Sequence, residues 1–498
     1  MFARSASRRT PPAEGITIPS TLRGNAISSL AMEAHEWTVS EISKRVKSFH
    51  ERQQPFRVYH GATNSTRVVS FDPKTIVDTS SLSNIFSIDK ENSCAIVEPN
   101  VAMDQLVEET LKSGLVPSVI PEFPGITVGG AFSGSAAESS SFKYEYFDRV
   151  VNWVEIVLAD GEIVKASNTE LSDLFSGIVG GFGTLGVTTL FEIKLIPAAK
   201  YIEATYIPVS NTVDAISTIR KCADDVKYDF VDDIIFGPKH SIYGVIVVGR
   251  MADTRSFKGR RFNRAKDPWF YLHALRSGSC TESIPIVDYL FRYDRGAFWM
   301  GRFSFGLIPF NRITRWMLDP LMRTRKMYEA MHAMGRSQHF IIQDLVMPAE
   351  TVEQLINYLE KNISIYPLWL CPIRANSDAF MQQHPRPTDL LINVGVWGYT
   401  RDTLMDFEEF KKKNRDIEKT VKELGGLKWL YVHTYYTEEE FWNIYDRPKY
   451  DALRTKYHAE TLPSVYQKVR SKDEFQKSNA TKGFFSAIIG KTSLLSTK

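Results

Sequence analysis

The chain has 498 residues, of which 43% are hydrophobic and 24% charged, an ordinary composition for a globular protein of two or three domains. A net charge of +3 argues against a nucleic-acid partner, and four cysteines without CxxC spacing argue against a disulfide framework or a zinc site. No apolar run reaches about eighteen residues, so no transmembrane helix is predicted.

The N-terminal stretch MFARSASRRTPP carries arginines but no apolar segment, so no secretory signal is predicted and residues 1 to about 25 are expected to be a disordered leader. The elements expected next are a helix over 28–53, a short strand ending at Tyr59, strands VVSF, TIVDTS and CAIVEP within 68–101, a helix over 103–113, a hairpin of 150–158 with 163–166, and a strand over 187–196.

The composition shifts after Pro197 to a mixed α/β region with fewer glycines and many aromatic residues, which places a domain boundary near residue 200. Helices are predicted over 320–334, 349–361 and 402–424, and strands over 369–373, 390–397 and 428–434. From residue 471 onward the chain is polar and is expected to be disordered.

The most informative stretch runs from Pro117 to Ser141 and is rich in glycine, alanine and serine. Such a sequence packs poorly as helix or strand, but its backbone N–H groups can approach an anion closely. The added donors are the hydroxyls of Thr127, Ser133, Ser135 and Ser139. A flexible linker is the alternative, which the interleaved apolar residues Ile126, Val128, Ala131 and Phe132 disfavour.

Two further turns have the same character. The strand ending at Tyr59 runs into a turn of glycine, asparagine and hydroxyl residues over 60–66, where donors again converge. Residues 181–186 match G-x-G-x-x-G, but an alternating strand rather than a helix follows Gly186. The sequence therefore predicts a glycine-rich turn of a β-rich domain and not a Rossmann fold.

Together these turns resemble the FAD-binding PCMH-type domain of the vanillyl-alcohol oxidase and p-cresol methylhydroxylase superfamily. Within it, the segments VEPNVAM, P-E-x-x-x-x-TVGGAFSGSAAESSSFKY, VLADGEIV, SDLF and GTLGV are similar to the Δ24-sterol reductase family. The similarity continues through YPLWLCP, LLINVGVWG and LYVHTYYTEEEFWNIYD, and covers roughly residues 55 to 470.

The resemblance implies an α+β fold. A PCMH-type FAD-binding domain of two α/β subdomains is expected over 26–200, and a mixed α/β substrate or cap domain over 201–470. The leader (1–25) and a disordered tail (471–498) flank them.

The resemblance also implies the cofactor-binding residues: Thr127, Val128, Gly129, Gly130, Ala131, Phe132, Ser133, Gly134, Ser135, Ala136, Ala137, Glu138 and Ser139 in the central segment, His60, Gly61, Ala62, Thr63, Asn64 and Ser65 in the first loop, and Gly183, Thr184 and Gly186 in the third. Many members of the superfamily carry a histidine within the first loop that bonds covalently to the flavin. Here that segment reads Ala-Thr-Asn-Ser, so non-covalent FAD is expected.

The implied activity is reduction of the side-chain C24=C25 double bond of a desmosterol-like sterol, with NADPH as electron donor to FAD. An isolated alkene cannot stabilise a carbanion, so protonation at C24 is expected to create a tertiary cation at C25 that accepts the hydride. Tyr436 and His433 are the predicted proton donors. The alternative for both residues is an ordinary place in the aromatic core.

Other functions stay open at this point. One is an FAD-linked oxidase or dehydrogenase of a sugar lactone, alditol or terpenoid alcohol, and another is a flavin-binding scaffold without turnover. The alkene could also belong to a non-sterol terpenoid. Animal and plant relatives begin with a hydrophobic anchor that is not found in this sequence, so we expect a cytoplasmic protein with at most peripheral contact with the endoplasmic reticulum membrane.

Overall fold

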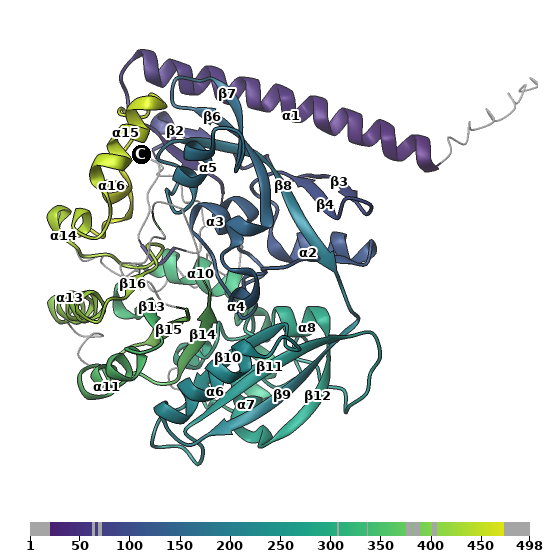
Figure 1. Ribbon diagram of the computed structural model, residues 1–498, viewed down its shortest axis with the longest axis vertical. Coiled ribbons are helices and arrows are strands. Elements are labelled where there is room, and N and C mark those ends of the chain that lie inside the picture. The colour runs from purple at the N-terminus through teal and green to yellow at the C-terminus, as the bar shows by residue number, and fades with distance from the viewer. Residues whose placement is uncertain are drawn as a thin grey trace, which may run out of the picture.

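The computed structural model describes residues 20–61, 65–67, 72–305, 308–335, 337–374, 381, 389–400 and 406–472. Helix α1 (Ser20–Glu51) begins ahead of its predicted start and overlaps the end of the expected leader. The rest of the leader, the predicted VVSF strand and residues 473–498 of the tail lie outside the described residues. The strands form sheets of two, six and eight strands, and the two larger sheets lie at opposite ends of the molecule in Figure 1.

The six-stranded sheet has the order β3-β4-β8-β6-β7, with β5 paired to the far end of β8. Its strands are β3 (Ile85–Asp89), β4 (Cys94–Val97), β5 (Leu115–Pro117), β6 (Val151–Leu158), β7 (Ile163–Ser167) and β8 (Gly186–Pro197). A separate parallel pair joins β1 (Arg57–Tyr59) to β2 (Ile76–Asp78). The predicted β6–β7 hairpin is confirmed, and Gly161 takes the positive φ of +95° that its tight turn requires.

Short helices connect these strands: η1 (Pro73–Thr75), α2 (Met103–Lys112), α3 (Val128–Ser133), α4 (Ser141–Tyr144), η2 (Phe147–Val150) and α5 (Ser172–Ile178). The glycine-rich segment is thus not wholly irregular as predicted, because α3 forms inside it. The Thr127 side chain caps α3 by accepting a hydrogen bond from the Gly130 N–H at 3.2 Å, which offsets the poor helix propensity of the glycines. After Gly186 the chain enters β8 and not a helix, so the non-Rossmann interpretation is confirmed.

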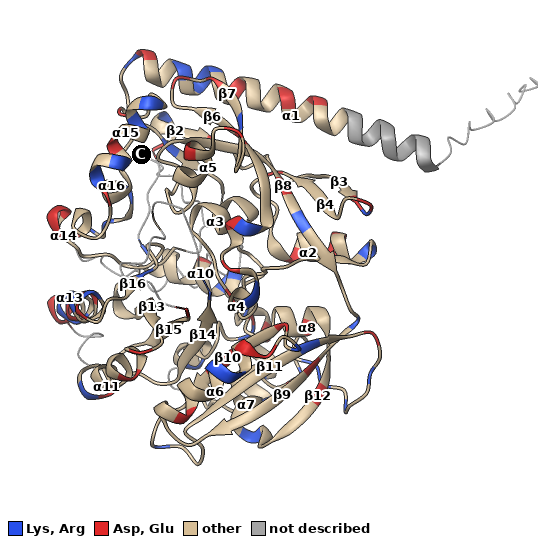
Figure 2. Cartoon of the chain, viewed as in Figure 1, with Lys and Arg blue, Asp and Glu red and all other residues tan. Residues whose placement is uncertain are grey.

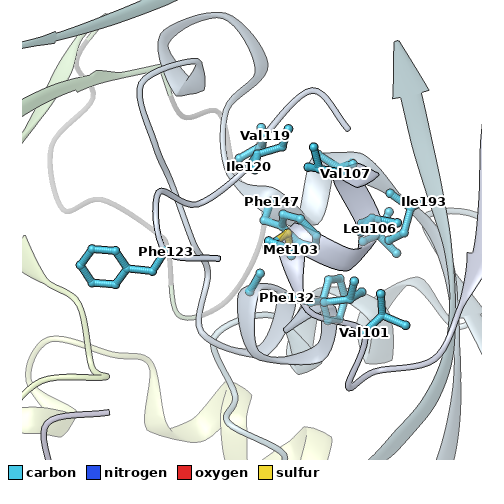
Figure 3. Packing of buried hydrophobic residues seen from close by; sticks show 14 of the residues in the cluster. Val101, Met103, Leu106, Val107, Val119, Ile120, Phe123, Phe132, Phe147 and Ile193 are labelled. Atoms are coloured by element: carbon cyan, nitrogen blue, oxygen red, sulfur yellow. The ribbon is translucent and has the colours of Figure 1, made fainter. Parts of the chain in front are cut away.

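Helices α2 and α3 pack on the six-stranded sheet through an apolar core. Met103, Leu106 and Val107 follow helical spacing on the buried face of α2. Figure 3 shows them gathered with Phe132 of α3, whereas Phe123 points away from this cluster. The segment before α3 therefore contributes to a second group of aromatic residues.

The eight-stranded sheet is built from residues after 200, in the order β12-β9-β11-β10-β14-β15-β13-β16. Its strands are β9 (Tyr201–Val209), β10 (Phe230–Ile235), β11 (Gly244–Ala252), β12 (Cys280–Pro285), β13 (Ile341–Pro348), β14 (Leu368–Ile373), β15 (Leu391–Gly398) and β16 (Leu427–Lys428). The predicted strand over 428–434 is wrong, because β16 ends at Lys428.

Its connecting helices are α6 (Thr212–Asp224), α7 (Phe270–Ser277), α8 (Ile286–Leu290), η3 (Met300–Phe305), α9 (Arg312–Leu318), η4 (Asp319–Leu321), α10 (Thr324–Met334), η5 (Ser337–His339), α11 (Val352–Asn362), α13 (Phe407–Glu423) and α14 (Glu438–Trp442). The predicted helices over 320–334, 349–361 and 402–424 correspond to α10, α11 and α13; of the third, residues 402–405 lie outside the described residues.

The two faces of this sheet have different chemistry. Along β14, Leu368 and Leu370 pack under α6, α11 and α13, whereas Trp369 and Cys371 face the six-stranded sheet side. Neighbouring side chains point to opposite faces of a strand, so one short sequence supplies both a core face and a cleft face. Figure 2 shows the charged residues of α13 on the outside of this helical layer.

The chain ends by returning to its beginning. Helices α15 (Arg447–Lys456) and α16 (Val465–Val469) lie beside the first half of the chain in Figure 1. Tyr457 donates a hydrogen bond to Asp173 at 2.7 Å, and Tyr450 donates one to Thr184 at 2.9 Å. Within the described part of the chain, none of the helices combines the length and apolar character that crossing a bilayer requires.

Candidate functional site

A cleft separates the glycine-rich segment from the inner face of the eight-stranded sheet. Twelve of the predicted cofactor residues line it: His60, Ser65, Thr127, Gly129, Gly130, Ala131, Ser133, Gly134, Ala136, Ala137, Gly183 and Gly186. All three predicted loops therefore meet at one site, although they are far apart in the sequence.

The remaining predicted residues stand behind this lining or outside the described chain. Val128, Phe132, Ser135, Glu138, Ser139, Gly61 and Thr184 do not line the cleft, and residues 62–64 lie outside the described residues. Val128 and Phe132 are fully buried in the apolar core. Their role is to anchor α3, so that its opposite face is held against the cleft.

The backbone donors at the start of α3 are already used. The Val128 N–H donates to the Val101 carbonyl at 2.9 Å and the Gly129 N–H to the Pro99 carbonyl at 2.8 Å. A Cβ on Gly129 would lie 2.9 Å from the Cβ of Pro99, so only glycine permits this approach. The glycines of α3 thus give the cleft a flat wall rather than a set of free anion donors.

Positive charge gathers at another end of the cleft. Arg57, Arg67 and Lys468 all line it, and no acidic side chain among the described residues pairs with them. Burial is the largest cause that lowers the pKa of Lys468, and the charges of Arg57 and Arg67 add to it. Together they lower this pKa to about 7. Burial and Arg57 likewise lower the pKa of Arg67 to about 9. Arg67 is buried, and Arg57 and Lys468 are half-buried. A cluster of such cations without counter-charge is stabilised by a bound anion.

These cations could not be found by motif, because Lys468 lies on α16 and the arginines flank the first loop. The Arg67 guanidinium is fixed by donating to the Val432 carbonyl at 2.9 Å and to the Leu430 carbonyl. His60 is not a further cation, because burial and Lys468 lower its pKa to about 4. The chemistry of this end fits the pyrophosphate of a dinucleotide.

The opposite wall is aromatic. Phe298, Tyr328, Trp369, Trp397, Trp429 and Tyr431 line the cleft together with Cys371 and Ile373. Phe123 makes edge contacts with Phe298, Tyr328 and Trp397 at centroid distances of 5.5, 6.2 and 5.7 Å, which explains its separation from the core in Figure 3.

Two polar side chains interrupt this aromatic wall. Asp344 accepts hydrogen bonds from Asn393 Nδ2 at 3.0 Å and from the Tyr431 hydroxyl. A Cβ on Gly395 would lie 2.9 Å from Asp344 Oδ1, so the glycine makes room for this carboxyl. Burial raises the pKa of Asp344 above its ordinary value, although its hydrogen bonds act in the opposite direction. Asn393 is the single polar side chain in the apolar strand sequence LLINVGVWG, and this is the signal that could have found it.

Glu122 is the other acid of the cleft. It is only 7% exposed, lines the cleft beside the aromatic wall, and its Oε1 has no hydrogen-bond partner among the described residues. Burial raises the pKa of Glu122 well above its ordinary value, and nearby Glu138 raises it further. An unpartnered buried carboxyl is most stable as the neutral acid.

The groups around Glu122 explain which carboxyl holds a proton. Arg292 is the nearby guanidinium, and it pairs with Asp232 at 3.0 Å. Asp232 also accepts hydrogen bonds from Tyr293 and Trp369, and Glu138 accepts them from Ser139 and Ser140. Glu122 alone among these three carboxyl groups accepts no hydrogen bond from a side chain of the described residues. Burial raises the pKa of both Glu122 and Glu138, and protonation is most favoured at Glu122.

The two predicted proton donors do not reach the cleft. His433 is buried behind it, and burial with nearby Lys428 and Arg67 lowers its pKa to about 3, so it holds no transferable proton near neutral pH. Tyr436 packs with Phe441, Tyr445 and other aromatics in a separate cluster. The placement of both residues is that of core aromatics, and the cleft residues of this block are instead Trp429 and Tyr431.

The sequence of the chain is similar to those of known proteins. Residues 37–167 match the family model of an FAD binding domain. The chain is 30% identical to the Delta(24)-sterol reductase of Homo sapiens over 467 residues, which cover 89% of this chain and 87% of that protein. It is 31% identical to the Delta(24)-sterol reductase of Arabidopsis thaliana over 442 residues, 80% of this chain and 77% of that protein.

A shorter similarity joins the chain to the D-lactate dehydrogenase of Anaerostipes hadrus, at 29% identity over 39% of this chain and 42% of that protein. The class of protein is therefore a flavoprotein oxidoreductase with an FAD-binding domain of the PCMH type. Within that class, the chain belongs to the Delta(24)-sterol reductase family.

Proposed function

We propose that this protein reduces the side-chain C24=C25 double bond of a sterol such as desmosterol, with NADPH as the electron donor. The observation that carries the proposal is the cleft, in which a flat glycine wall faces a wall of aromatic side chains and a neutral buried acid. An oxidase of sugar lactones or alditols is less well supported, because its polyhydroxylated substrates need many polar partners that this aromatic wall lacks.

The residues of the cleft fit FAD. Arg57, Arg67 and Lys468 would hold the pyrophosphate, and the α3 face with Gly129 and Gly130 would lie against the flat flavin ring. The flavin, when bound and reduced, supplies a hydride for the substrate. Because the expected site of a covalent histidine reads Ala-Thr-Asn-Ser, we propose non-covalent binding.

We propose Glu122 as the acid that protonates the alkene. Its O–H bond breaks and the π electrons form a C–H bond at C24, which leaves a tertiary cation at C25 to accept the hydride. Trp369 and Trp397 face the same space and stabilise transient positive charge through their π faces, each by about 0.5–2 kcal/mol. The Glu122 carboxylate then recovers a proton from solvent.

Two experiments test this function. The purified protein is reduced anaerobically with NADPH while the flavin absorbance is recorded, and desmosterol is then added. We expect bleaching by NADPH and recovery with desmosterol; flavin that ignores NADPH would favour a dehydrogenase instead. With the reaction run in D2O, deuterium is expected at C24, and solvent deuterium at C25 would contradict protonation by Glu122.

We further propose that residues 26–200 form the FAD-binding domain with two α/β subdomains and that residues 201–470 form the substrate cap, with α15 and α16 closing the cofactor side. Contact with the endoplasmic reticulum membrane would be peripheral. The substrate, being a lipid, must leave a bilayer to reach the cleft.

A further inference from the structure

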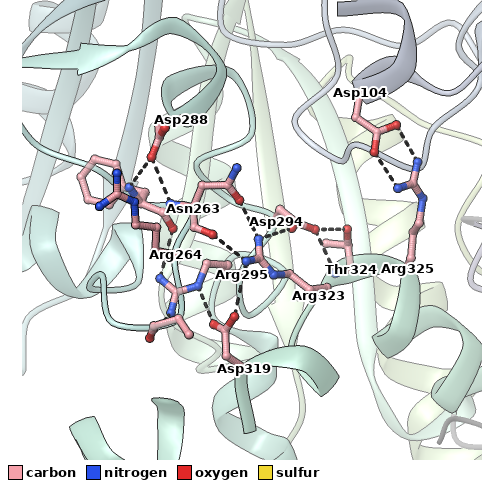
Figure 4. Close-up of polar contacts among 12 residues, drawn as sticks. Asp104, Asn263, Arg264, Asp288, Asp294, Arg295, Asp319, Arg323, Thr324 and Arg325 are labelled. Carbon is pink, nitrogen blue, oxygen red and sulfur yellow. Dashed lines mark hydrogen bonds and ion pairs between the residues drawn. The ribbon is translucent and has the colours of Figure 1, made fainter. Parts of the chain in front are cut away.

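An excursion of the chain from Gly296 to Met322 begins and ends at the same point. Its first part is buried, and its second part, from Ile308 to Met317, lies at the surface. At its base the Gly296 N–H donates a hydrogen bond to the Met322 carbonyl at 2.7 Å. The backbones of Arg295 and Arg323 form an isolated antiparallel β-bridge beside it. Arg295 also binds Asp319 at 2.6 Å, as Figure 4 shows. The two ends are therefore held together by buried, hydrogen-bonded charges.

A second set of contacts in Figure 4 strengthens this base. Arg323 binds Asp294 at 3.0 Å, and the Thr324 hydroxyl donates to the same carboxyl at 2.6 Å. Because both ends are fixed, the exposed part of the chain between them, from Ile308 to Met317, is held in a defined orientation.

The outward part of the excursion carries large apolar side chains in water. Ile313, Trp316 and Met317 are 68%, 57% and 65% exposed, and they occupy positions i, i+3 and i+4 of α9, which places them on one face of the helix. Ile308, 47% exposed, precedes them. No residue of α9 is fully buried, and Leu318 at its end packs against the core, so Ile313, Trp316 and Met317 are left facing outward. A contiguous exposed patch of this kind marks an interaction surface.

The positive charge of the excursion indicates the chemical nature of the partner that this surface would bind. No Asp or Glu occurs from residue 296 to residue 318, whereas Arg302, Arg312 and Arg315 lie within it. None of these arginines pairs with an acidic side chain among the described residues. Arg302 and Arg315 lie over the Phe310 ring, at 5.8 and 4.9 Å from its centroid. Apolar side chains flanked by arginines suit the boundary between phosphate headgroups and acyl chains.

The same excursion reaches the cleft. Its first turn includes Phe298, which lines the cleft, and Trp299, which donates a hydrogen bond to the Trp397 carbonyl at 2.7 Å. Phe303 packs on Tyr399 at 4.7 Å between ring centroids. The apolar surface outside and the aromatic wall inside therefore belong to one continuous segment.

We propose that Ile308, Ile313, Trp316 and Met317, with the neighbouring arginines, form a lipid-docking surface that seats the protein on an anionic phospholipid membrane. This inference rests on the proposed function in one respect: the docking surface would bring the cleft to a membrane that contains the sterol substrate. The surface itself requires no turnover.

The test uses the full-length holoprotein and sterol-free vesicles of phosphatidylcholine containing about 20 mol% phosphatidylserine. We expect the wild type to float with these vesicles, and the triple variant I313S/W316S/M317S to bind at least tenfold more weakly. The variant R312Q/R315Q is expected to lose roughly fivefold for each arginine on these vesicles and little on neutral ones. Its residual binding should depend less on salt than that of the wild type.

The matched control is Trp37→Ser on α1. Trp37 is 68% exposed, comparable to Trp316, but its neighbours Glu33 and Glu36 are acidic. We expect Trp37→Ser to float like the wild type. NADPH-dependent bleaching of the flavin in every variant reports that the fold is intact.

Three outcomes would overturn the proposal. They are a wild type that does not float, a triple variant that floats as the wild type does, and equal loss in Trp37→Ser. If the wild type is instead a dimer in sedimentation and the triple variant a monomer, without vesicle binding, the surface is an interface between two copies. A protein that floats but leaves desmosterol unreduced would contradict the proposed function and leave the docking surface standing.

Discussion

Single residues divide the cleft into two chemical regions. Arg57, Arg67 and Lys468 make one region cationic, whereas Glu122 and Asp344 place two buried carboxyl groups, both with a raised pKa, against the aromatic wall of the other. Anion binding and proton donation are therefore separated within one cavity, and each can be removed without the other.

The first prediction concerns proton donation by Glu122. The isosteric change Glu122→Gln removes the acidic proton without emptying the site, so FAD binding and bleaching by NADPH are expected to persist. Reoxidation by desmosterol, followed in a stopped-flow spectrophotometer, is expected to slow by roughly a hundredfold to ten-thousandfold, the usual loss for a general acid. Asp344→Asn is the comparison variant; if it stops reoxidation and Glu122→Gln does not, the Tyr431–Asp344 pair is the proton source.

The second prediction concerns the anion site. With a pKa of about 7 in the free protein, Lys468 is partly neutral at physiological pH, and a bound pyrophosphate favours its charged form. FAD binding should therefore take up a proton, and the affinity should fall as the pH rises above 7. Isothermal titration calorimetry in buffers of different ionisation enthalpy measures this uptake.

The same site can be tested by substitution. Lys468→Met is expected to weaken FAD binding by about tenfold to a hundredfold, since hydrogen bonds to charged groups contribute about 1.5–3 kcal/mol, and to remove the proton uptake. The exposed Lys449 serves as the control, and Lys449→Met should bind FAD normally. Proton uptake that survives in Lys468→Met would assign the titration to another group.

Residue-level reasoning from sequence found the three loops that line the cleft, where backbone shape decides, and missed side chains that converge from distant parts of the chain. Each of the three loops needs its glycines for its own backbone geometry. The pattern of each loop is therefore visible within a single short stretch of sequence. Arg67, Glu122 and Lys468 become a site only when the fold brings them together, and the sequence around each does not show which partners it will meet. Aromatic density misled the choice of His433 and Tyr436, because core and cleft aromatics look the same in sequence.

Among the elements, α1 is joined to the six-stranded sheet by a buried histidine. His35 Nδ1 lies 2.7 Å from Glu98, and its Nε2 lies 3.2 Å from Glu155 of β6. Burial alone would lower the pKa of His35, but the hydrogen bonds to Glu155 and Glu98 outweigh it and raise the pKa to about 9. The charged imidazolium therefore stabilises the docking of α1.

The third prediction follows from this link. A raised histidine pKa stabilises the fold fully below the unfolded value of 6.5, and that stability is lost as the pH rises through about 9. One pKa unit corresponds to about 1.4 kcal/mol, so roughly 3 kcal/mol should disappear between pH 6.5 and 9.5. Urea unfolding followed by circular dichroism measures this loss.

His35→Leu provides the comparison. It leaves Glu98 buried without its partner and is expected to destabilise the protein by about 3–5 kcal/mol at pH 6.5. The variant should show a much flatter dependence on pH over the same interval. If its dependence stays as steep as that of the wild type, His35 is not the titrating group.

At the element scale the sequence predicted most helices and strands, because their apolar periodicity is local. The exceptions are instructive. Strand β16 stops at Lys428, whose Nζ turns inward to Glu418 at 2.7 Å, so the apolar residues after it pack as a loop. Helix α3 forms among poor helix formers because Thr127 caps it and Phe132 anchors it in the core.

At the scale of the whole molecule, the segment 127–139 and α16 meet at the same cleft. The fourth prediction tests whether FAD stabilises both of them. FAD is expected to slow hydrogen exchange in the segment 127–139 and in α16 together, although they are far apart in sequence. At an FAD concentration of about one hundred times Kd, the slowing should approach a hundredfold where exchange requires opening of the cleft. Hydrogen exchange with mass spectrometry gives both values in one experiment.

Helix α6 is the internal reference, because it covers the opposite face of the eight-stranded sheet and should not change. Protection of the segment 127–139 without protection of α16 would contradict a shared site. Lys468→Met should reduce the protection of both segments at the same FAD concentration.

The return of α16 to the first half of the chain also fixes when the protein can acquire its cofactor during biosynthesis. A ribosome that adds about 5–20 residues per second has exposed the three glycine-rich loops long before it reaches Lys468. The cationic end of the cleft is therefore incomplete until α16 has been synthesised. Flavin is then expected to be retained only after that point, and premature termination before α16 yields a chain that carries the loops but retains little flavin.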